Sequence, residues 1–254
     1  MRIVIGIPAR MGSTRFPGKP LCKILGKTMI EHCFKRSSFS NHVTEVFIAG
    51  CDQEVEKEVK KFKGNFIMTE KNISRPGLRV AAAAEKLNLN DEDIVVVVQG
   101  DEPLLNPEMI DLAIKPLIEN NDILVSNLCS VITENEWSDP GEVKVVCDLE
   151  MNALYMSRSP IPSVAHEELR AVWWKQVCIM PFKWHFMKKF NYELEETPLE
   201  LQESIEMIRA IQHGYKIRMI PSPYLTKSVD TEDDRKIAEE LMLNDQLYLK
   251  YNET

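Results

Sequence analysis

Two short runs of this 254-residue chain are apolar on both faces, and they constrain the fold more than any other feature. Residues 3–5 read Ile-Val-Ile and residues 94–98 read Ile-Val-Val-Val-Val, so neither run has a polar position to turn toward solvent. Strands buried on both faces are typical of parallel sheets whose crossover helices cover each side. The two runs therefore predict the centre of an α/β fold.

The rest of the chain alternates short β-branched segments with longer amphipathic ones, which is the pattern of βαβ units. We expect strands near residues 2–8, 43–49, 64–68, 93–99, 122–131, 142–147 and 215–220. We expect helices near residues 27–38, 53–62, 78–87, 107–119, 183–190, 199–213 and 231–249, followed by a frayed tail over residues 248–254. The pattern offers no boundary at which to divide the chain, so we predict a single domain over residues 1–254.

Charge and cysteine content exclude several classes of protein. The net charge of −8 argues against a broad nucleic-acid surface, because such surfaces depend on clustered lysine and arginine. The six cysteines include no Cys-x-x-Cys pair, which argues against a zinc site or a disulfide framework and favours a reducing cytoplasm. No run approaches the ~18 apolar residues of a membrane span. We therefore predict a cytoplasmic protein that binds neither nucleic acid nor membrane.

The loop after the first strand carries the first functional signal. Residues 8–20 read Pro-Ala-Arg-Met-Gly-Ser-Thr-Arg-Phe-Pro-Gly-Lys-Pro and include the cations Arg10, Arg15 and Lys19. Backbone N–H groups and fixed positive charge can surround a polyphosphate, so this loop indicates a nucleoside triphosphate site. Its spacing matches neither a P-loop nor a Rossmann glycine motif, and a solvated strand-to-helix turn accounts for the loop alone equally well.

Residues 99–103, Gln-Gly-Asp-Glu-Pro, give the second signal because they follow the second buried run. An acid at this place, Asp101, can hold a magnesium ion against phosphate oxygens, although an ordinary turn has the same composition. The carboxyl ends of parallel strands share one crevice, so we expect this segment to lie beside the Arg10 loop.

Residues 228–234, Ser-Val-Asp-Thr-Glu-Asp-Asp, precede the last expected helix. Helix capping by Asp230 or Thr231, with Asp234 as the partner three residues into the helix, accounts for every acid in this segment. A metal role would require Asp230 to face Asp101 across the crevice.

In combination, the motifs of this chain resemble those of the bacterial 3-deoxy-manno-octulosonate (Kdo) cytidylyltransferases, the CMP-Kdo synthetases. The similarity runs from residue 3 to about residue 240. The matching segments are residues 8–21, 99–103, 143–146, 153–158, 198–200 with Glu203 and Glu206, and 229–231. The resemblance implies a Rossmann-like, glycosyltransferase-A-type α/β nucleotidyltransferase fold with a mixed, mainly parallel central sheet. It also implies a homodimer, with a dimerisation and substrate-covering region around residues 130–200.

The same resemblance implies an activity and the residues that perform it. The enzyme would use Mg²⁺ to couple CTP to a Kdo-like sugar acid, releasing pyrophosphate, for synthesis of lipopolysaccharide or capsule. Lys19, Arg10 and Asp101 would be catalytic, and Asp101 and Asp230 would hold the metal. The sugar acid would contact Arg158, Gln176 and Glu203. The nucleotide would contact Pro8, Ala9, Arg10, Gly12, Ser13, Arg15, Lys19, Arg79, Gln99 and Gly100.

Three segments depart from the family pattern. Residues 75–79, Arg-Pro-Gly-Leu-Arg, stand where the family has Ser-Gly-Thr-Asp-Arg or its Glu variant, beside the nucleotide. Residues 49–51 read Ala-Gly-Cys instead of Ala-Thr-Asp, and residues 176–180 read Gln-Val-Cys-Ile-Met instead of His-Leu-Gly-Ile-Tyr near the sugar acid. Lost polar matches alter substrate discrimination. A different base or sugar acceptor therefore stays open, as does a catalytically silent nucleotide-binding paralogue, and we favour altered specificity because Lys19, Asp101 and Asp230 are present.

Several other residues have structural interpretations. Trp173 and Trp174 would point to opposite faces of a strand, one into the core and one at an interface. The core face of the expected helix over residues 199–213 would consist of Leu201, Ile205, Ile208 and Ile211. Its solvated face, judged by pattern alone, would carry Glu200, Glu203 and Glu206.

Overall fold

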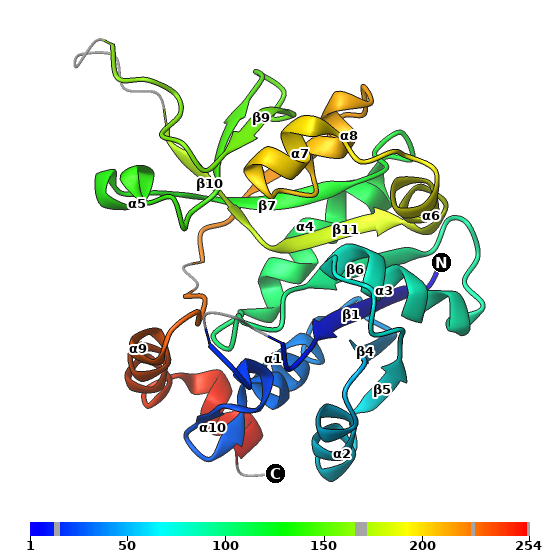
Figure 1. Cartoon of the computed structure of the whole chain (residues 1–254), viewed down its shortest axis with the longest axis vertical. Helices are drawn as coiled ribbons and strands as arrows, with labels where there is room; N and C mark the ends of the chain where they lie inside the picture. The colour runs from blue at the N-terminus through cyan, green and yellow to red at the C-terminus, as the bar shows by residue number, and fades with distance from the viewer. Residues whose placement is uncertain (13–15, 166–171, 225–226, 253–254) are drawn as a thin grey trace.

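The computed structural model describes residues 1–12, 16–165, 172–224 and 227–252, and its main strands form two five-stranded sheets (Figure 1). The first sheet has the order β11-β6-β1-β4-β5. Its strands are β1 (Ile3–Ala9), β4 (Glu45–Gly50), β5 (Asn65–Met68), β6 (Ile94–Val98) and β11 (Ile179–Lys183). Only β11 is antiparallel to its neighbour. The predicted mixed, mainly parallel sheet is therefore confirmed.

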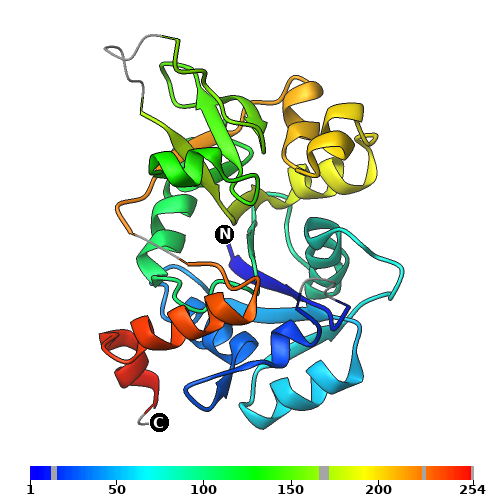
Figure 2. The same cartoon turned by 60° about the vertical axis from the view of Figure 1, so that its left-hand side comes forward.

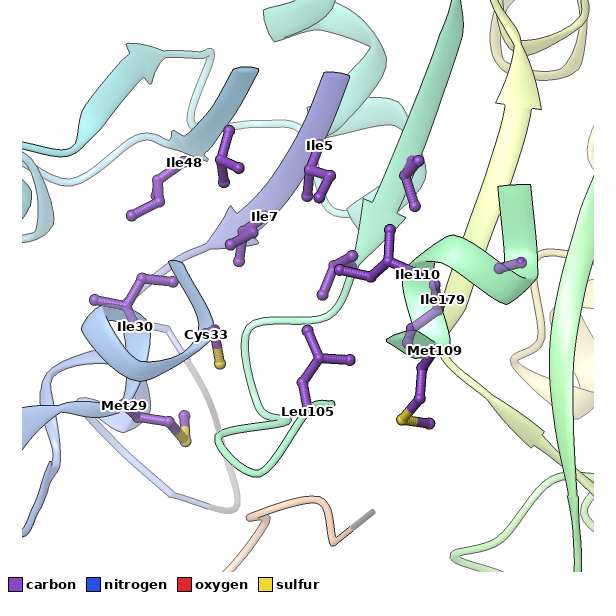
Figure 3. Packing of buried hydrophobic residues seen from close by; sticks show 14 of the residues in the cluster. Ile5, Ile7, Met29, Ile30, Cys33, Ile48, Leu105, Met109, Ile110 and Ile179 are labelled. Atoms are coloured by element: carbon purple, nitrogen blue, oxygen red, sulfur yellow. The ribbon is translucent and has the colours of Figure 1, made fainter. Parts of the chain in front are cut away.

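Helices cover both faces of this sheet, as the doubly apolar runs predict. The helices α1 (Met29–Ser37), α2 (Gln53–Lys61) and α4 (Pro107–Glu119) bury one face. Ile5 and Ile7 of β1 share this core with Met29 and Ile30 of α1, and Figure 3 shows Ile7 close to Ile30. The opposite face packs against α3 (Pro76–Ala84) and α6 (Trp184–Tyr192), and a 3₁₀ turn over Glu85–Leu87 extends α3. Because both faces are covered, a ligand can reach the parallel strands at their carboxyl edge.

The second sheet has the order β12-β7-β10-β8-β9 and is mainly antiparallel. Its strands are β7 (Ser126–Val131), β8 (Lys144–Cys147), β9 (Ala153–Ser157), β10 (Trp174–Val177) and β12 (Arg218–Pro221). A single residue, Cys178, separates β10 of this sheet from β11 of the first. The side chain of Asn127 reinforces this junction, since its amide nitrogen donates to the carbonyl of Val177 at 2.6 Å.

The structure contains strands that the sequence pattern does not reveal. The segments that form β9, β10 and β11 lack a run of β-branched residues, and β11 contains Pro181, which is tolerated because β11 is an edge strand of its sheet. A short hairpin, β2 (Lys23–Ile24) and β3 (Lys27–Thr28), and the short helix α5 (Glu134–Ser138) are also additional. In this region Trp174 packs against the core of the second sheet, and Trp173 stacks on Trp137 with ring centroids 5.0 Å apart.

The prediction of one continuous helix over residues 199–213 is wrong. The structure has two helices in this region, α7 (Pro198–Glu203) and α8 (Ile208–Gln212). The first helix ends because Ser204 has a left-handed backbone, with φ of 54°. The break rotates the apolar positions relative to one another. Ile205 and Ile208 are buried as predicted, whereas Leu201 is 63% exposed and does not belong to the core.

The expected helix over residues 231–249 is likewise two helices, α9 (Glu232–Met242) and α10 (Gln246–Asn252). The predicted frayed tail is wrong, because α10 buries Tyr248 and Tyr251. The hydroxyl of Tyr251 lies 2.6 Å from Nδ1 of His32 on α1. Figures 1 and 2 both show the two C-terminal helices against the half of the molecule that contains β1 and α1. Within the described ranges, no helix has the length and apolarity needed to cross a bilayer.

Candidate active site

A cavity of about 310 Å³ opens at the carboxyl ends of β1 and β6. It brings together the loop after β1 and the segment after β6, which the topology of parallel strands predicts. The cavity is lined by Pro8, Ala9, Arg10, Lys19, Pro20, Met29, Ser74, Pro76, Arg79, Gln99, Gly100 and Asp101. Three of these twelve residues are cationic and one is acidic, so the lining suits an anionic ligand although the chain is acidic as a whole.

Lys19 connects two acids from distant parts of the chain. Its Nζ lies 2.7 Å from Oδ2 of Asp101 and 2.7 Å from Oδ1 of Asp230. Burial alone would lower the pKa of Lys19, but the two carboxylates outweigh that effect and raise it. The ammonium is therefore charged at neutral pH. The backbone N–H of Val229 donates to the carbonyl of Asp101 at 2.9 Å, which fixes Asp230 against the end of β6.

The capping of α9 leaves the Asp230 carboxylate facing Lys19. The N-cap is Thr231, whose hydroxyl accepts from the backbone N–H of Asp234 at 3.2 Å. Asp234 in turn accepts from the backbone N–H of Thr231 at 3.0 Å, completing a capping box. The box uses the carboxylate of Asp234, so the sequence alternative that Asp230 caps the helix is resolved in favour of Thr231.

The pair formed by Asp101 and Asp230 fits a hard divalent cation of a particular kind. Mg²⁺ is commonly held by one or two carboxylates, with waters and substrate phosphates completing its coordination. Within the described part of the chain, no group of three or more His, Cys, Asp or Glu side chains is arranged to hold a metal. Two carboxylates beside a cationic cavity therefore match a cation shared with phosphate oxygens better than a closed protein cage.

The loop after β1 is held by a residue that the sequence reasoning missed. The carboxylate of Asp52 accepts from the backbone N–H of Met11 at 2.9 Å, which fixes the chain beside Arg10. Asp52 follows β4, and the rule that gathers parallel strand ends at one edge could have identified it. Gly12 is exposed, while the predicted Ser13 and Arg15 lie outside the described residues.

Gly100 allows the segment after β6 to lie close to the end of β1. A Cβ at this position would lie 3.0 Å from the carbonyl oxygen of Pro8. The glycine therefore lets the end of β6 approach β1 at the cavity floor.

Arg79 lines the cavity but uses most of its donors on its own surroundings. Its guanidinium donates to the hydroxyl of Thr69 at 2.6 Å, to the carbonyl of Glu70 at 3.2 Å and to the carbonyl of Ile73. These bonds hold the segment that leads to Ser74 at the cavity wall. The side chain therefore shapes the cavity and adds positive charge to it.

The predicted solvated face of three glutamates is wrong. Glu200 is 4% exposed and forms a buried ion pair with Arg209. Glu206 accepts from the backbone N–H of Gly77 at the start of α3, and burial raises its pKa to about 7. Both carboxylates therefore act inside the fold.

Glu203, the last residue of α7, lies against Arg158, which follows β9, and neither residue lines the cavity. The Glu203 carboxylate accepts from the hydroxyl of Ser157 at 2.7 Å, from the hydroxyl of Tyr155 at 3.2 Å and from the backbone N–H of Arg158 at 2.8 Å. These bonds outweigh the effect of burial and lower its pKa. Lys144, fully buried, donates to the carbonyl of Arg158 at 2.6 Å. The end of β9 is therefore held rigidly from two sides.

Gln176 also lies outside the cavity lining, on β10. Its amide donates to Oδ1 of Asn127 at 2.6 Å, so it takes part in the junction between the sheets. Cys178, two residues further on, is half-buried, and desolvation of its thiol raises the thiol pKa. The three predicted sugar-acid residues therefore lie on β10, on α7 and directly after β9, and none of them lines the cavity.

Comparison with known proteins agrees with this fold. The sequence profile of the family Cytidylyltransferase matches residues 3–220. The chain is 38% identical over 253 residues to a 3-deoxy-manno-octulosonate cytidylyltransferase of Geobacter metallireducens, covering 95% of this chain and 98% of that protein. It is 36% identical to an 8-amino-3,8-dideoxy-manno-octulosonate cytidylyltransferase of Shewanella loihica, covering 94% and 98%.

Among solved structures, a CMP:2-keto-3-deoxy-manno-octonic acid synthetase complexed with CTP superposes with a TM-score of 0.89 at 34% identity, covering 96% of this chain and 99% of that one. The fold and the cationic cavity thus define a nucleotidyltransferase. Within that class, the chain belongs to the cytidylyltransferase family of the 3-deoxy-manno-octulosonate cytidylyltransferases.

Proposed function

We propose that this enzyme transfers the cytidylyl group of CTP to a Kdo-type sugar acid, producing a CMP-sugar and pyrophosphate in the cytoplasm for surface polysaccharide synthesis. The observation that carries the proposal is the cavity in which Arg10, Lys19 and Asp101 meet at the carboxyl edge of the first sheet. The extended similarity to enzymes named for Kdo and for its 8-amino analogue supports the class of acceptor.

In this proposal, Arg10 and Lys19 bind the triphosphate together with Pro8, Ala9, Gln99 and Gly100 at the cavity floor. Mg²⁺ held by Asp101 and Asp230 would supply Lewis-acid stabilisation of phosphoryl charge. Lys19 would neutralise negative charge on the α-phosphoryl group and the leaving pyrophosphate. Arg158 would position the carboxylate of the sugar acid, whose anomeric hydroxyl attacks the α-phosphorus in line. Glu203 would hold Arg158 for this purpose.

Replacement of Asp101 by Asn tests the proposal. We expect Asp101→Asn to abolish Mg²⁺-dependent pyrophosphate release while the protein unfolds at nearly the same temperature, because the change removes a ligand charge and no core volume. The matched control is Asp233→Asn in the segment of Asp230, since the Asp233 side chain is 87% exposed. Near-normal turnover of Asp101→Asn would contradict the metal assignment.

We also infer that the departures at residues 75–79 and 176–180 change the specificity. Pro76 lines the cavity, and Gln176 directs its amide to Asn127, so neither position offers the polar groups of the family pattern. Each lost buried polar match costs on the order of 1–3 kcal/mol in discrimination. We expect Kdo to be a poorer acceptor than another sugar acid, such as an 8-amino analogue, with CTP still the donor.

A pyrophosphate-release screen decides this point by crossing four nucleoside triphosphates with Kdo, its 8-amino analogue, other ulosonic acids and sugar phosphates. The quantity compared is kcat/KM for each pair. If CTP with Kdo is the best pair by a wide margin, the departures have no effect on specificity.

We propose in addition that the enzyme is a homodimer formed through the region around residues 130–200. Apolar side chains in this region are exposed in the chain, with Val131 58% and Val172 55% exposed. Sedimentation equilibrium measures the mass in solution. A monomer at micromolar concentration would contradict the proposal.

A further inference from the structure

The two acids proposed to hold the metal share one cation from the chain itself. The Lys19 ammonium lies 2.7 Å from Oδ2 of Asp101 and 2.7 Å from Oδ1 of Asp230. A Mg²⁺ ion binds carboxylate oxygen at about 2.0–2.1 Å. An ion bonded to both of these oxygens would need the space that the ammonium fills.

We propose that Lys19 competes directly with the divalent cation for Asp101 and Asp230, so that it leaves the two carboxylates before the cation binds both. The proposal rests on the proposed function, because it takes the two acids as metal ligands. It adds that the lysine which serves the triphosphate also controls access of the cation.

Electrostatics favours this competition. With the ammonium between them, the two carboxylates and Lys19 carry a net charge of −1, whereas the carboxylates alone carry −2. A divalent cation approaching the occupied pair also meets a like charge within a few ångströms, in a site where only 12% of the Lys19 side chain is exposed. Removal of the lysine should therefore strengthen binding of the free cation.

The local structure allows Lys19 to leave by movement of its side chain alone. Its backbone is fixed in a 3₁₀ turn, with its N–H donating to the carbonyl of Phe16 at 3.1 Å and its carbonyl accepting from Cys22 at 3.2 Å. The flexible four-carbon side chain carries a point charge that can turn from the acids to phosphate oxygens in the cavity that Lys19 lines. An anionic triphosphate there would offer the ammonium a replacement for both carboxylates.

Mn²⁺ binding without nucleotide tests the competition, with free Mn²⁺ followed by electron paramagnetic resonance. We expect Lys19→Met to bind Mn²⁺ more tightly than the wild type by on the order of tenfold or more. Lys19→Arg, which keeps the charge, should stay close to the wild type. The gain should disappear in the double variant Lys19→Met/Asp101→Asn.

Lys227→Met is the matched control. Lys227 lies 2.7 Å from Asp234 of the same segment, so this variant removes one positive charge that does not contact Asp101 or Asp230. Thermal unfolding establishes that each variant is folded. Mn²⁺ affinity of Lys19→Met no higher than that of the wild type, or a gain equalled by Lys227→Met, would overturn the competition. The metal assignment itself is tested by a different measurement: normal turnover of Asp101→Asn would contradict it.

Discussion

Glu206 joins the start of α3 to the segment between α7 and α8. It accepts from the backbone N–H of Gly77, and a Cβ at residue 77 would lie 2.6 Å from its Oε2. Any larger residue at position 77 would therefore displace the carboxylate. Pro76, the preceding residue, lines the cavity, so the contact sets one wall of the site. In the sequence, Gly77 is only part of a segment that departs from the family pattern. The structure shows that the close packing of Glu206 requires a glycine there.

The raised pKa of Glu206 predicts a pH dependence of stability. Its pKa is about 7 in the folded protein against 4.5 ordinarily, so the folded state holds the proton more tightly than the unfolded state. Its contribution to the free energy of unfolding is therefore full below about pH 4.5 and is lost as the pH rises through 7. Glu206→Gln, which cannot ionise, should be more stable than the wild type at pH 8 by on the order of 2 kcal/mol.

Urea unfolding of Glu206→Gln and wild type between pH 4.5 and pH 8 measures this difference. The two proteins should differ least at the acid end, where both carry a neutral side chain at position 206. A difference in unfolding free energy that is the same at both ends would contradict the ionisation of Glu206 as its cause.

At the scale of elements, the approach of α3 to β1 depends on one glycine. A Cβ at Gly6 would lie 2.3 Å from Cγ1 of Val80 and 2.8 Å from the ring of Phe47, both buried. We expect Gly6→Ala to lower the free energy of unfolding by about 1–3 kcal/mol, because the packed core must shift to accept the methyl group. Denaturant unfolding measures the loss.

Gly12→Ala is the control for this prediction, since a Cβ at Gly12 meets none of the described residues within 4 Å. Its free energy of unfolding should change by less than about 0.5 kcal/mol. Equal losses for the two variants would contradict close packing around Gly6 as the cause.

The central elements could be predicted from sequence because they are specified locally. The apolar runs of β1 and β6 admit one environment, and the loops after them follow from parallel topology. The break at Ser204 could not be predicted, since serine has no special preference for a left-handed backbone and only the tertiary fold imposes it there. The capping box of α9 was predictable, but only the Asp230 contact with Lys19 shows which acid is left for the site.

The candidate site was predictable in part for the same reason. Residues in the loops that follow the parallel strands, such as Lys19 and Asp101, follow from motif and topology together. Glu203 and Gln176 do not, because their partners come from segments that are distant in sequence: Ser157 for one and Asn127 for the other. Residue type alone cannot tell a group that binds substrate from one that supports the site.

For the whole molecule, the two sheets should unfold together. Val125, just before β7, bridges to Phe182 of β11, and the chain passes directly from β10 to β11 at Cys178. Neither sheet can lose its strands without exposing the edge of the other. We therefore expect a single transition, consistent with one domain over residues 1–254.

Calorimetry and two optical probes test this expectation. The calorimetric and van't Hoff enthalpies should agree, and urea curves followed by far-ultraviolet circular dichroism and by tryptophan fluorescence should coincide. Two resolved transitions would contradict a single cooperative unit.

The one-residue junction at Cys178 also restricts how the chain length can vary. Side chains alternate between faces along a strand, so an insertion or deletion of one residue between Gln176 and Ile179 would turn every later side chain of β11 to the opposite face. Met180 and Phe182 would then exchange places with Ile179 and Pro181 across the sheet. Natural variants should therefore accept substitutions at this junction but keep its length, and insertions should collect in the loops at either end.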